Sequence, residues 1–170
     1  MTNQEAHHLP LTSINQESLI LDDLINFSSS KEISAIHPIL AQSKSLNIPI
    51  FSSKVEAGFA SPADDFIEEY LDLNHLLVKN NDATFFVKVS GKSMIDSGIF
   101  PDDILIVDRS ITAKNSKIVI ANVDGDVTVK RLCIEHDRVI LKSENAQHKD
   151  IVVTGELHIW GVVTSVIHQV

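Results

Sequence analysis

The chain has 170 residues, 44% of them hydrophobic, and a formal net charge of −9; this suits one domain with an extension and argues against broad nucleic-acid binding, which requires Lys and Arg. The single cysteine, Cys133, excludes an intramolecular disulfide and fits a reducing compartment. Since no apolar run approaches the roughly 20 residues of a membrane span and the first ten residues lack a signal-peptide pattern, we expect a cytoplasmic protein that makes no membrane contact.

The first part of the chain, residues 1–51, is polar, has no Gly and no Arg, and contains only Lys31 and Lys44 as basic residues. An amphipathic stretch at Leu19–Ile25 and a weaker one at Ile33–Leu40 are candidates for short helices. A DNA-reading helix would need a basic face, so we expect no direct sequence-specific DNA binding. The composition predicts an arm that is poorly structured or loosely docked.

A linker follows, and it contains one peptide bond of interest, between Ala57 and Gly58. Small residues let the backbone approach closely, so this segment could lie extended in a groove as a substrate strand. The same dipeptide is also common in ordinary linkers, and the sequence leaves both interpretations open. Next, Pro62 begins a predicted short acidic helix that reaches Tyr70.

The remainder of the chain reads as short strands separated by turn residues. The candidates are Thr84–Val89, Ile104–Asp108, Lys117–Val123, Asp126–Leu132, Arg138–Lys142 and His158–His168. Asp124-Gly125 lies between two of them and predicts a β-hairpin, because both residues tolerate positive φ. The fold class expected is therefore mainly β, a compact antiparallel barrel or sandwich-like domain.

A candidate nucleophile follows the first of these strands. The turn Ser90-Gly91-Lys92 would place Ser93 just past the strand end with an exposed hydroxyl and nearby backbone N–H groups. These are the minimum requirements for a nucleophile with an oxyanion hole. A serine also needs a base.

The candidate base is Lys130, on the returning strand of the predicted hairpin, where it shares a face with Thr128. One interpretation places Lys130 on the solvent face, as is usual for Lys. The other places it in a dry site beside Ser93, where desolvation would lower its pKa and free the amine to act as a general base, with Thr128 helping to hold it.

Other chemistries find little support in the sequence. The His residues are scattered, His7 and His8 are adjacent rather than spaced as ligands, and Ser93 is not within a Gly-x-Ser-x-Gly elbow. No Gly-rich phosphate loop and no metal-ligand spacing occurs. We therefore expect no cofactor and no metal.

Several segments carry a family resemblance. They are the bond Ala57-Gly58, residues 86–99 (FVKVSGKSMIDSGI), residues 103–108 (DILIVD), residues 123–132 (VDGDVTVKRL) and residues 160–163 (WGVV). In this order they resemble the LexA/UmuD-type self-cleaving Ser-Lys peptidases of the bacterial SOS response. Residues 64–77 are similar to the UmuD-type members in particular, although the arm is longer here and the bond is Ala-Gly rather than the Cys-Gly of some of them.

The resemblance implies a LexA/UmuD-type fold with Ser93 as nucleophile and Lys130 as general base. It implies self-cleavage between Ala57 and Gly58, so that residues 1–57 are an arm that is removed and residues 58–170 are the peptidase-like β domain.

The resemblance also implies partners. Family members are homodimers whose cleavage is stimulated by a RecA filament on single-stranded DNA. The trimmed dimer then serves a UmuC-type translesion polymerase (DNA polymerase V) in error-prone repair. Two alternatives stay open: a LexA-like or phage-type self-cleaving repressor, and an interaction module with an inactive site. A signal-peptidase-like role would use similar chemistry but require a membrane anchor.

Overall fold

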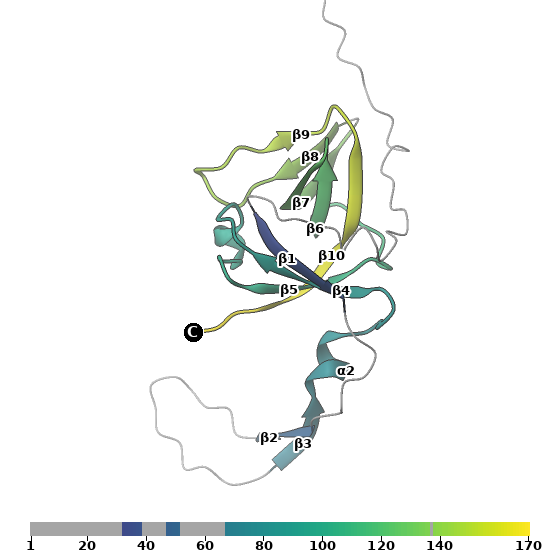
Figure 1. Cartoon of the computed structure of the whole chain (residues 1–170), viewed down its shortest axis with the longest axis vertical. Coiled ribbons are helices and arrows are strands. Elements are labelled where there is room, and N and C mark those ends of the chain that lie inside the picture. The colour runs from purple at the N-terminus through teal and green to yellow at the C-terminus, as the bar shows by residue number, and fades with distance from the viewer. Residues whose placement is uncertain (1–31, 39–46, 52–66, 137) are drawn as a thin grey trace, which may run out of the picture.

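The computed structural model describes residues 32–38, 47–51, 67–136 and 138–170, and Figure 1 shows their arrangement. The elements are β1 (Ile33–Pro38), β2 (Asn47–Phe51), β3 (Ile67–Asp72), α2 (Leu73–Leu77), β4 (Thr84–Val89), the short 3-10 helix η2 (Ile95–Ser97), β5 (Ile104–Asp108), β6 (Ile118–Val123), β7 (Asp126–Glu135), β8 (Arg138–Lys142), β9 (Ile151–Val152) and β10 (Leu157–Ile167). The mainly β, antiparallel fold class is confirmed.

Eight strands form one antiparallel sheet in the order β1-β4-β5-β10-β6-β7-β8-β9. The central strand, β10, has a register shift against each of its two neighbours, and such bulges bend a strand and increase its twist. The sheet curls so far that β1 and β7 contact each other, although β4, β5, β10 and β6 lie between them in the ladder. The result is a half-barrel whose two closing strands are β1, at one edge of the sheet, and β7, the third strand from the other edge (Figure 1).

The predicted hairpin at Asp124-Gly125 is confirmed. Asp124 has a φ of 51° and Gly125 a φ of 96°, and the flanking residues Val123 and Asp126 are paired. A two-residue turn with two consecutive positive φ angles has a backbone twist that suits the right-handed twist of the strands it joins. This turn fixes the register of β6 against β7, and with it the face on which Lys130 lies.

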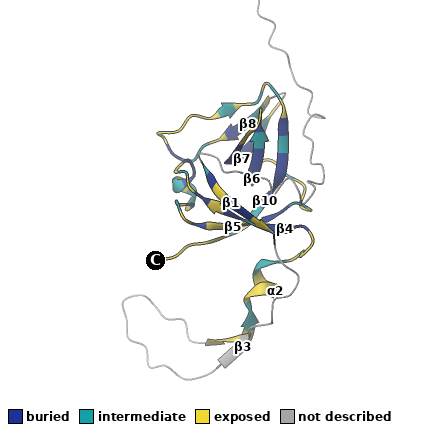
Figure 2. Ribbon diagram, in the orientation of Figure 1, coloured by how far each residue is buried: buried dark blue, intermediate teal, exposed yellow. Residues whose placement is uncertain are grey.

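The core lies inside the curl, and Figure 2 shows buried residues along β1, β4, β6, β7 and β10. One cluster joins strands of both ends of the sheet around Phe85, Val87 and Trp160, and a second packs around Leu132, Leu141 and Ile159. Because the first cluster includes residues of β1 as well as β7, it holds the two closing strands together.

The arm contributes to this core, which the sequence did not predict. Ile33 and Ile36 are 0% and 9% exposed, on a strand paired with β4. The helix expected at Ile33–Leu40 is therefore wrong over residues 33–38. A register shift between Ile33 and Ala35 turns both isoleucines inward, and their three-residue spacing imitates a helical face.

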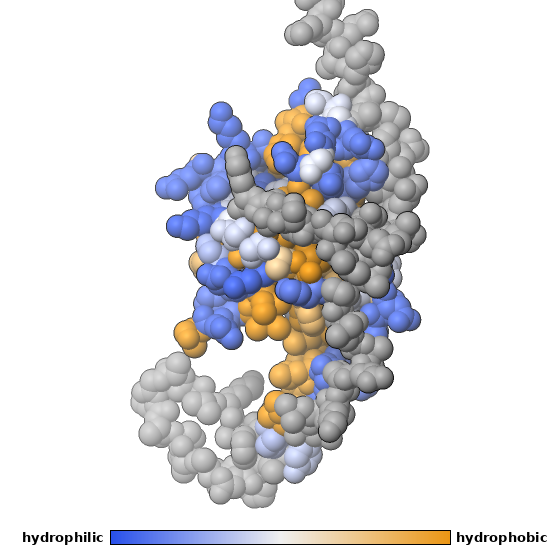
Figure 3. Space-filling view, in the orientation of Figure 1, coloured by the Kyte–Doolittle hydropathy of each residue, from blue (hydrophilic) through white to orange (hydrophobic). Residues whose placement is uncertain are grey.

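A second, two-stranded sheet pairs β2 with β3 and leads into α2. The acidic helix expected from Pro62 to Tyr70 is wrong from Ile67 onward, where the chain is a strand. Several apolar residues of this extension are exposed, among them Ile48, Leu73 and Leu76, and Figure 3 shows apolar surface along this part of the molecule.

The two strands of this extension flank residues 52–66. The bond between Ala57 and Gly58, the boundary at residue 57 and the helix expected at Leu19–Ile25 all lie outside the described residues. Within the described ranges, no helix is long and apolar enough to cross a membrane.

Replacing Ile33 by Ala tests whether β1 is part of the folded core. Because the side chain is fully buried, the cavity is expected to lower the free energy of unfolding by about 2–5 kcal/mol, measured by chemical denaturation. His37→Ala on the same strand, where the side chain is exposed, is the control, and its effect should stay within about 0.5 kcal/mol. Equal effects of the two changes would show that β1 does not pack on the sheet.

Candidate active site

Ser93 lies in the loop between β4 and η2, and its position is fixed by a second loop that follows β8. The backbone N–H of Glu144 donates to the Ser93 carbonyl at 2.7 Å, and the Asn145 side-chain amide donates to the Lys92 carbonyl at 2.8 Å. Glu144 is itself ion-paired with Arg131 of β7. The serine loop is thus clamped onto the strand that carries Lys130.

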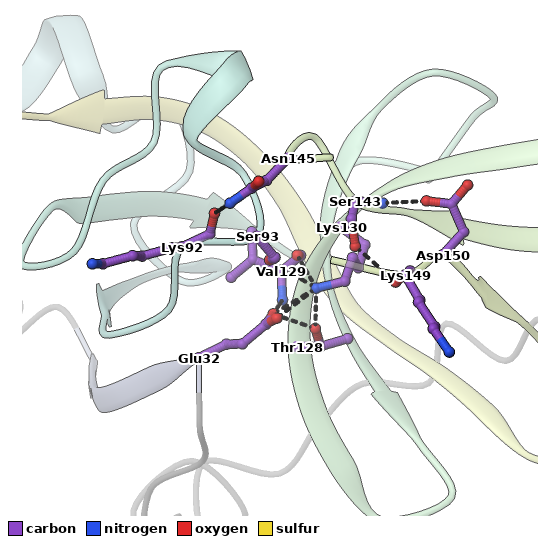
Figure 4. Close-up of polar contacts among 10 residues, drawn as sticks. All are labelled: Glu32, Lys92, Ser93, Thr128, Val129, Lys130, Ser143, Asn145, Lys149 and Asp150. Carbon is purple, nitrogen blue, oxygen red and sulfur yellow. Dashed lines mark hydrogen bonds and ion pairs between the residues drawn. The ribbon is translucent and has the colours of Figure 1, made fainter. Parts of the chain in front are cut away.

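Lys130 is buried within β7, with 2% of the residue exposed. Its Nζ donates to Ser93 Oγ at 2.8 Å and to Thr128 Oγ1 at 2.9 Å, and it lies 3.1 Å from the Val129 carbonyl oxygen. Figure 4 shows the three side chains converging. Of the two interpretations that the sequence left open, the solvent-exposed one is wrong, and the structure brings Lys130 and Ser93 into hydrogen-bond contact.

A fourth side chain, that of Glu32, completes the cluster, and sequence reasoning missed it. Both carboxylate oxygens accept from Lys130 Nζ at 2.7 Å. One of them also accepts from the Thr128 hydroxyl and, at 3.2 Å, from the Val129 N–H. The Glu32 side chain is 18% exposed and that of Lys130 is 3% exposed, and Figure 4 shows the carboxylate beside Lys130 and Thr128.

The backbone around Glu32 is held as firmly as its side chain. Its carbonyl accepts from Ser90 N at 2.8 Å and from Gly91 N at 3.3 Å. A Cβ at Gly91 would lie 2.8 Å from Glu32 Cγ and 3.0 Å from its Cα, closer than packing allows. Gly91 therefore permits the close approach of this segment.

The pKa values of the pair reflect burial and mutual attraction. Burial lowers the pKa of Lys130 below its usual value; the hydrogen bond and charge of Glu32, and the charge of Asp150, oppose this. Burial raises the pKa of Glu32, but four interactions lower it, and the pKa lies below its usual value as a result. In order of size they are the hydrogen bonds from Lys130 and Thr128, the charge of Lys130, and the hydrogen-bonding effect of Ser93. The contact of Lys130 Nζ with both carboxylate oxygens at 2.7 Å is the geometry of an ammonium–carboxylate ion pair.

A serine hydroxyl beside a buried amine is suited to acyl transfer, with the amine as base. The expectation that the Ser93 hydroxyl is exposed is wrong, because the residue is 2% exposed. No signal in the sequence could have located Glu32, a single acidic residue before an apolar strand, since its place depends on the curl of the sheet. Among the described residues, no group of three or more His, Cys, Asp or Glu is arranged to hold a metal ion.

The model of the family described as Peptidase S24-like matches residues 49–164. Protein SamA of Salmonella typhimurium is 41% identical over 121 residues, 71% of this chain and 85% of SamA. Protein ImpA of Escherichia coli is 39% identical over 121 residues, 71% of this chain and 83% of ImpA. The LexA repressor of Geotalea uraniireducens is 38% identical over 144 residues, 83% of this chain and 69% of that repressor.

The contact of Glu32 with Lys130 predicts an acid-dependent part of the stability. Because the pKa of folded Glu32 lies below the usual 4.5, its contribution is present above pH 4.5 and is lost as the pH falls through the folded value. The difference in free energy of unfolding between the parent and Glu32→Gln should therefore shrink on acidification, as measured by chemical denaturation. Glu135→Gln, at an exposed position of β7, serves as the control. A difference that is independent of pH would contradict the ion pair.

Proposed function

This chain belongs to the Peptidase S24-like family of self-cleaving serine peptidases, in its UmuD-type branch, and from this premise we propose that Ser93 and Lys130 are its catalytic dyad. The observation that carries the proposal is the 2.8 Å contact between Ser93 Oγ and a lysine amine that is almost fully buried. A buried amine loses its proton more readily than one in water, which is what a general base for serine requires.

The substrate proposed is the bond between Ala57 and Gly58 of the chain itself. Neutral Lys130 accepts the Ser93 hydroxyl proton while the oxygen attacks the Ala57 carbonyl carbon. The C–N bond then breaks, Lys130 returns the proton to the Gly58 nitrogen, and an ester joins Ala57 to Ser93. Water attacks the ester, one of its protons passes through Lys130 to Ser93 Oγ, and Ala57 leaves as a carboxylic acid that loses the other proton to solvent and becomes a carboxylate.

The negative oxygen of the intermediate needs donors close to Ser93. Within the described part of the chain, the backbone N–H groups of Ser93 and Met94 donate to no other described residue. The loop that carries them is held by Glu144 and Asn145, so these donors are fixed before the reaction starts. Preorganised backbone N–H groups are the usual stabilisers of such an oxyanion.

The biological role proposed is that of a cytoplasmic SOS-response protein. A RecA filament on single-stranded DNA would favour the cleavable arrangement, a shift of population with the chemistry supplied by the chain itself. The trimmed homodimer would then serve a UmuC-type translesion polymerase. The identity of 39–41% with ImpA and SamA over 71% of the chain supports this branch.

A LexA-like repressor is the second candidate, favoured by the 144-residue match to a LexA repressor. Residues 1–51 contain only two basic residues, Lys31 and Lys44, whereas DNA binding depends on phosphate neutralisation. Gel-shift titration of the full chain with random and SOS-operator duplexes separates the two roles. Operator-specific retention would favour the repressor.

Intact-mass measurement tests the dyad and the bond together. The full chain is incubated with RecA, single-stranded DNA and nucleotide, and separately at alkaline pH, where Lys130 loses its proton without RecA. A fragment that begins at Gly58 is expected in both conditions, and it should be absent in Ser93→Ala and Lys130→Ala.

Ser110→Ala and Lys142→Ala change exposed residues and are the matched controls, which should cleave like the parent. Unchanged cleavage in Ser93→Ala would overturn the assignment of the nucleophile. Intact chains in every condition would favour the inactive interaction module.

Asn145→Ala tests the clamp on the serine loop. Loss of the hydrogen bond to the Lys92 carbonyl should let the loop shift, and misplacement of reacting groups by about 1 Å can cost roughly 100-fold in rate. We expect self-cleavage at alkaline pH to slow by roughly 10- to 100-fold, with the pH midpoint unchanged because Lys130 keeps its neighbours. A rate equal to that of the parent would show that Asn145 does not position Ser93.

A further inference from the structure

The arrangement described above is not ready to react. An ammonium has three N–H donors, and the oxygens within 3.1 Å of Lys130 Nζ belong to Glu32, Ser93, Thr128 and the Val129 carbonyl. A general base must instead accept the proton of Ser93 Oγ through a lone pair on the amine. Glu32 therefore stabilises the protonation state of Lys130 that cannot act.

Glu32 also occupies the place where a substrate must come. Its carboxylate bridges Lys130 Nζ, Thr128 Oγ1 and Val129 N. An attacked carbonyl has to lie about 3–3.5 Å from the nucleophile. The Glu32 oxygens lie 2.7 Å from Lys130 Nζ, which is itself 2.8 Å from Ser93 Oγ, so the carboxylate stands next to that position. Hydrolysis would itself leave a carboxylate on Ala57 beside the same two groups, so Glu32 resembles a bound product.

The strand that follows Glu32 occupies the adjoining edge of the sheet. β1 pairs with β4 from Ile33 to Pro38, and the donors Ser90 N and Gly91 N are both taken by the Glu32 carbonyl. Extended peptides are bound by adding a strand to such an edge. A different segment that entered the site along this edge would have to displace β1.

We propose that residues 32–38 are a built-in inhibitor of the dyad: β1 fills the edge of β4, and the Glu32 carboxylate blocks Ser93 and Lys130 until this segment leaves. The inference rests on the proposed function, because it describes how the activity of that same site is regulated. The family match begins at residue 49, so both Glu32 and β1 lie outside it. Glu32 is 25 residues before Ala57, and the whole inhibitor is on the arm that cleavage would remove.

The inhibitor must leave as a unit for the reaction to proceed. Ile33 and Ile36 fill the core beside Val87 and Val89, so displacement of the strand exposes apolar surface and is unfavourable. A competing segment or a partner that holds β1 away from β4 would supply the compensating interactions. Regulation of the dyad is then a competition between two segments of one arm for the same site.

The test measures self-cleavage of the full chain, without RecA, as a function of pH. Glu32→Gln keeps the size of the side chain but removes its charge, leaving Asp150 as the remaining carboxylate that acts on Lys130. Since Glu32 raises the pKa of Lys130, its removal should move the pH midpoint of cleavage down. Below that midpoint the rate should rise, by about tenfold for each unit by which the midpoint falls, because the fraction of neutral amine grows in that proportion.

Two further variants separate the inhibitor from other effects. Glu135→Gln, on the exposed end of β7, should cleave like the parent. Ile36→Ala weakens the packing of β1 without touching the dyad and should also accelerate cleavage, whereas general damage to the fold would slow it. Equal rates and equal midpoints in the parent and Glu32→Gln would overturn the inhibitor while leaving the peptidase intact.

A readout that needs no cleavage distinguishes failure of the inhibitor from failure of the peptidase. In the Ser93→Ala chain, NMR titration of the Lys130 side-chain carbon next to Nζ reports its protonation directly. Glu32→Gln in that background should lower the midpoint. An unchanged midpoint would overturn the contact between Glu32 and Lys130, and absence of cleavage from every chain, with RecA or at alkaline pH, would instead overturn the proposed function.

Discussion

The burial of a lysine amine is the constraint on which this structure depends. A charged ammonium with almost no exposure to water is stable only if oxygens surround it, and here Glu32, Ser93 and Thr128 supply them. When the carboxylate leaves, the same burial favours the neutral amine. The environment that requires an ion pair in one arrangement would therefore supply, in the other, the general base that we propose.

The curl of the sheet brings these groups together. Lys130 and Thr128 lie on β7, Ser93 follows β4, and Glu32 precedes β1 at the far edge of the ladder. A flat sheet would hold β1 and β7 well apart, with four strands between them, at about 4.8 Å per neighbouring pair. The two bulges of β10 allow the sheet to bend, so the site exists only at the closure of the half-barrel.

The arm serves the fold and the site at once. Its residues Ile33 and Ile36 complete the core cluster that includes Phe85, and the residue before them contacts the dyad. Cleavage after residue 57 would separate this strand covalently from the sheet that it completes. The strand's packing energy thus sets how readily the site opens, which links the stability of the resting protein to the control of its chemistry.

The local features of the structure can be predicted from the sequence alone. Six strands after residue 80, the Asp124-Gly125 hairpin and the candidates Ser93 and Lys130 follow from short-range propensities and turn chemistry, with the family resemblance joining them. Three features could be established only from the folded chain: Lys130 is buried, Ser93 is buried, and Glu32 contacts Lys130. Burial and ion pairing depend on segments that meet when the sheet curls. The bulge in β1 also places its two buried isoleucines three residues apart. This spacing is that of a helical face, so the sequence pattern alone could not distinguish the strand from a helix.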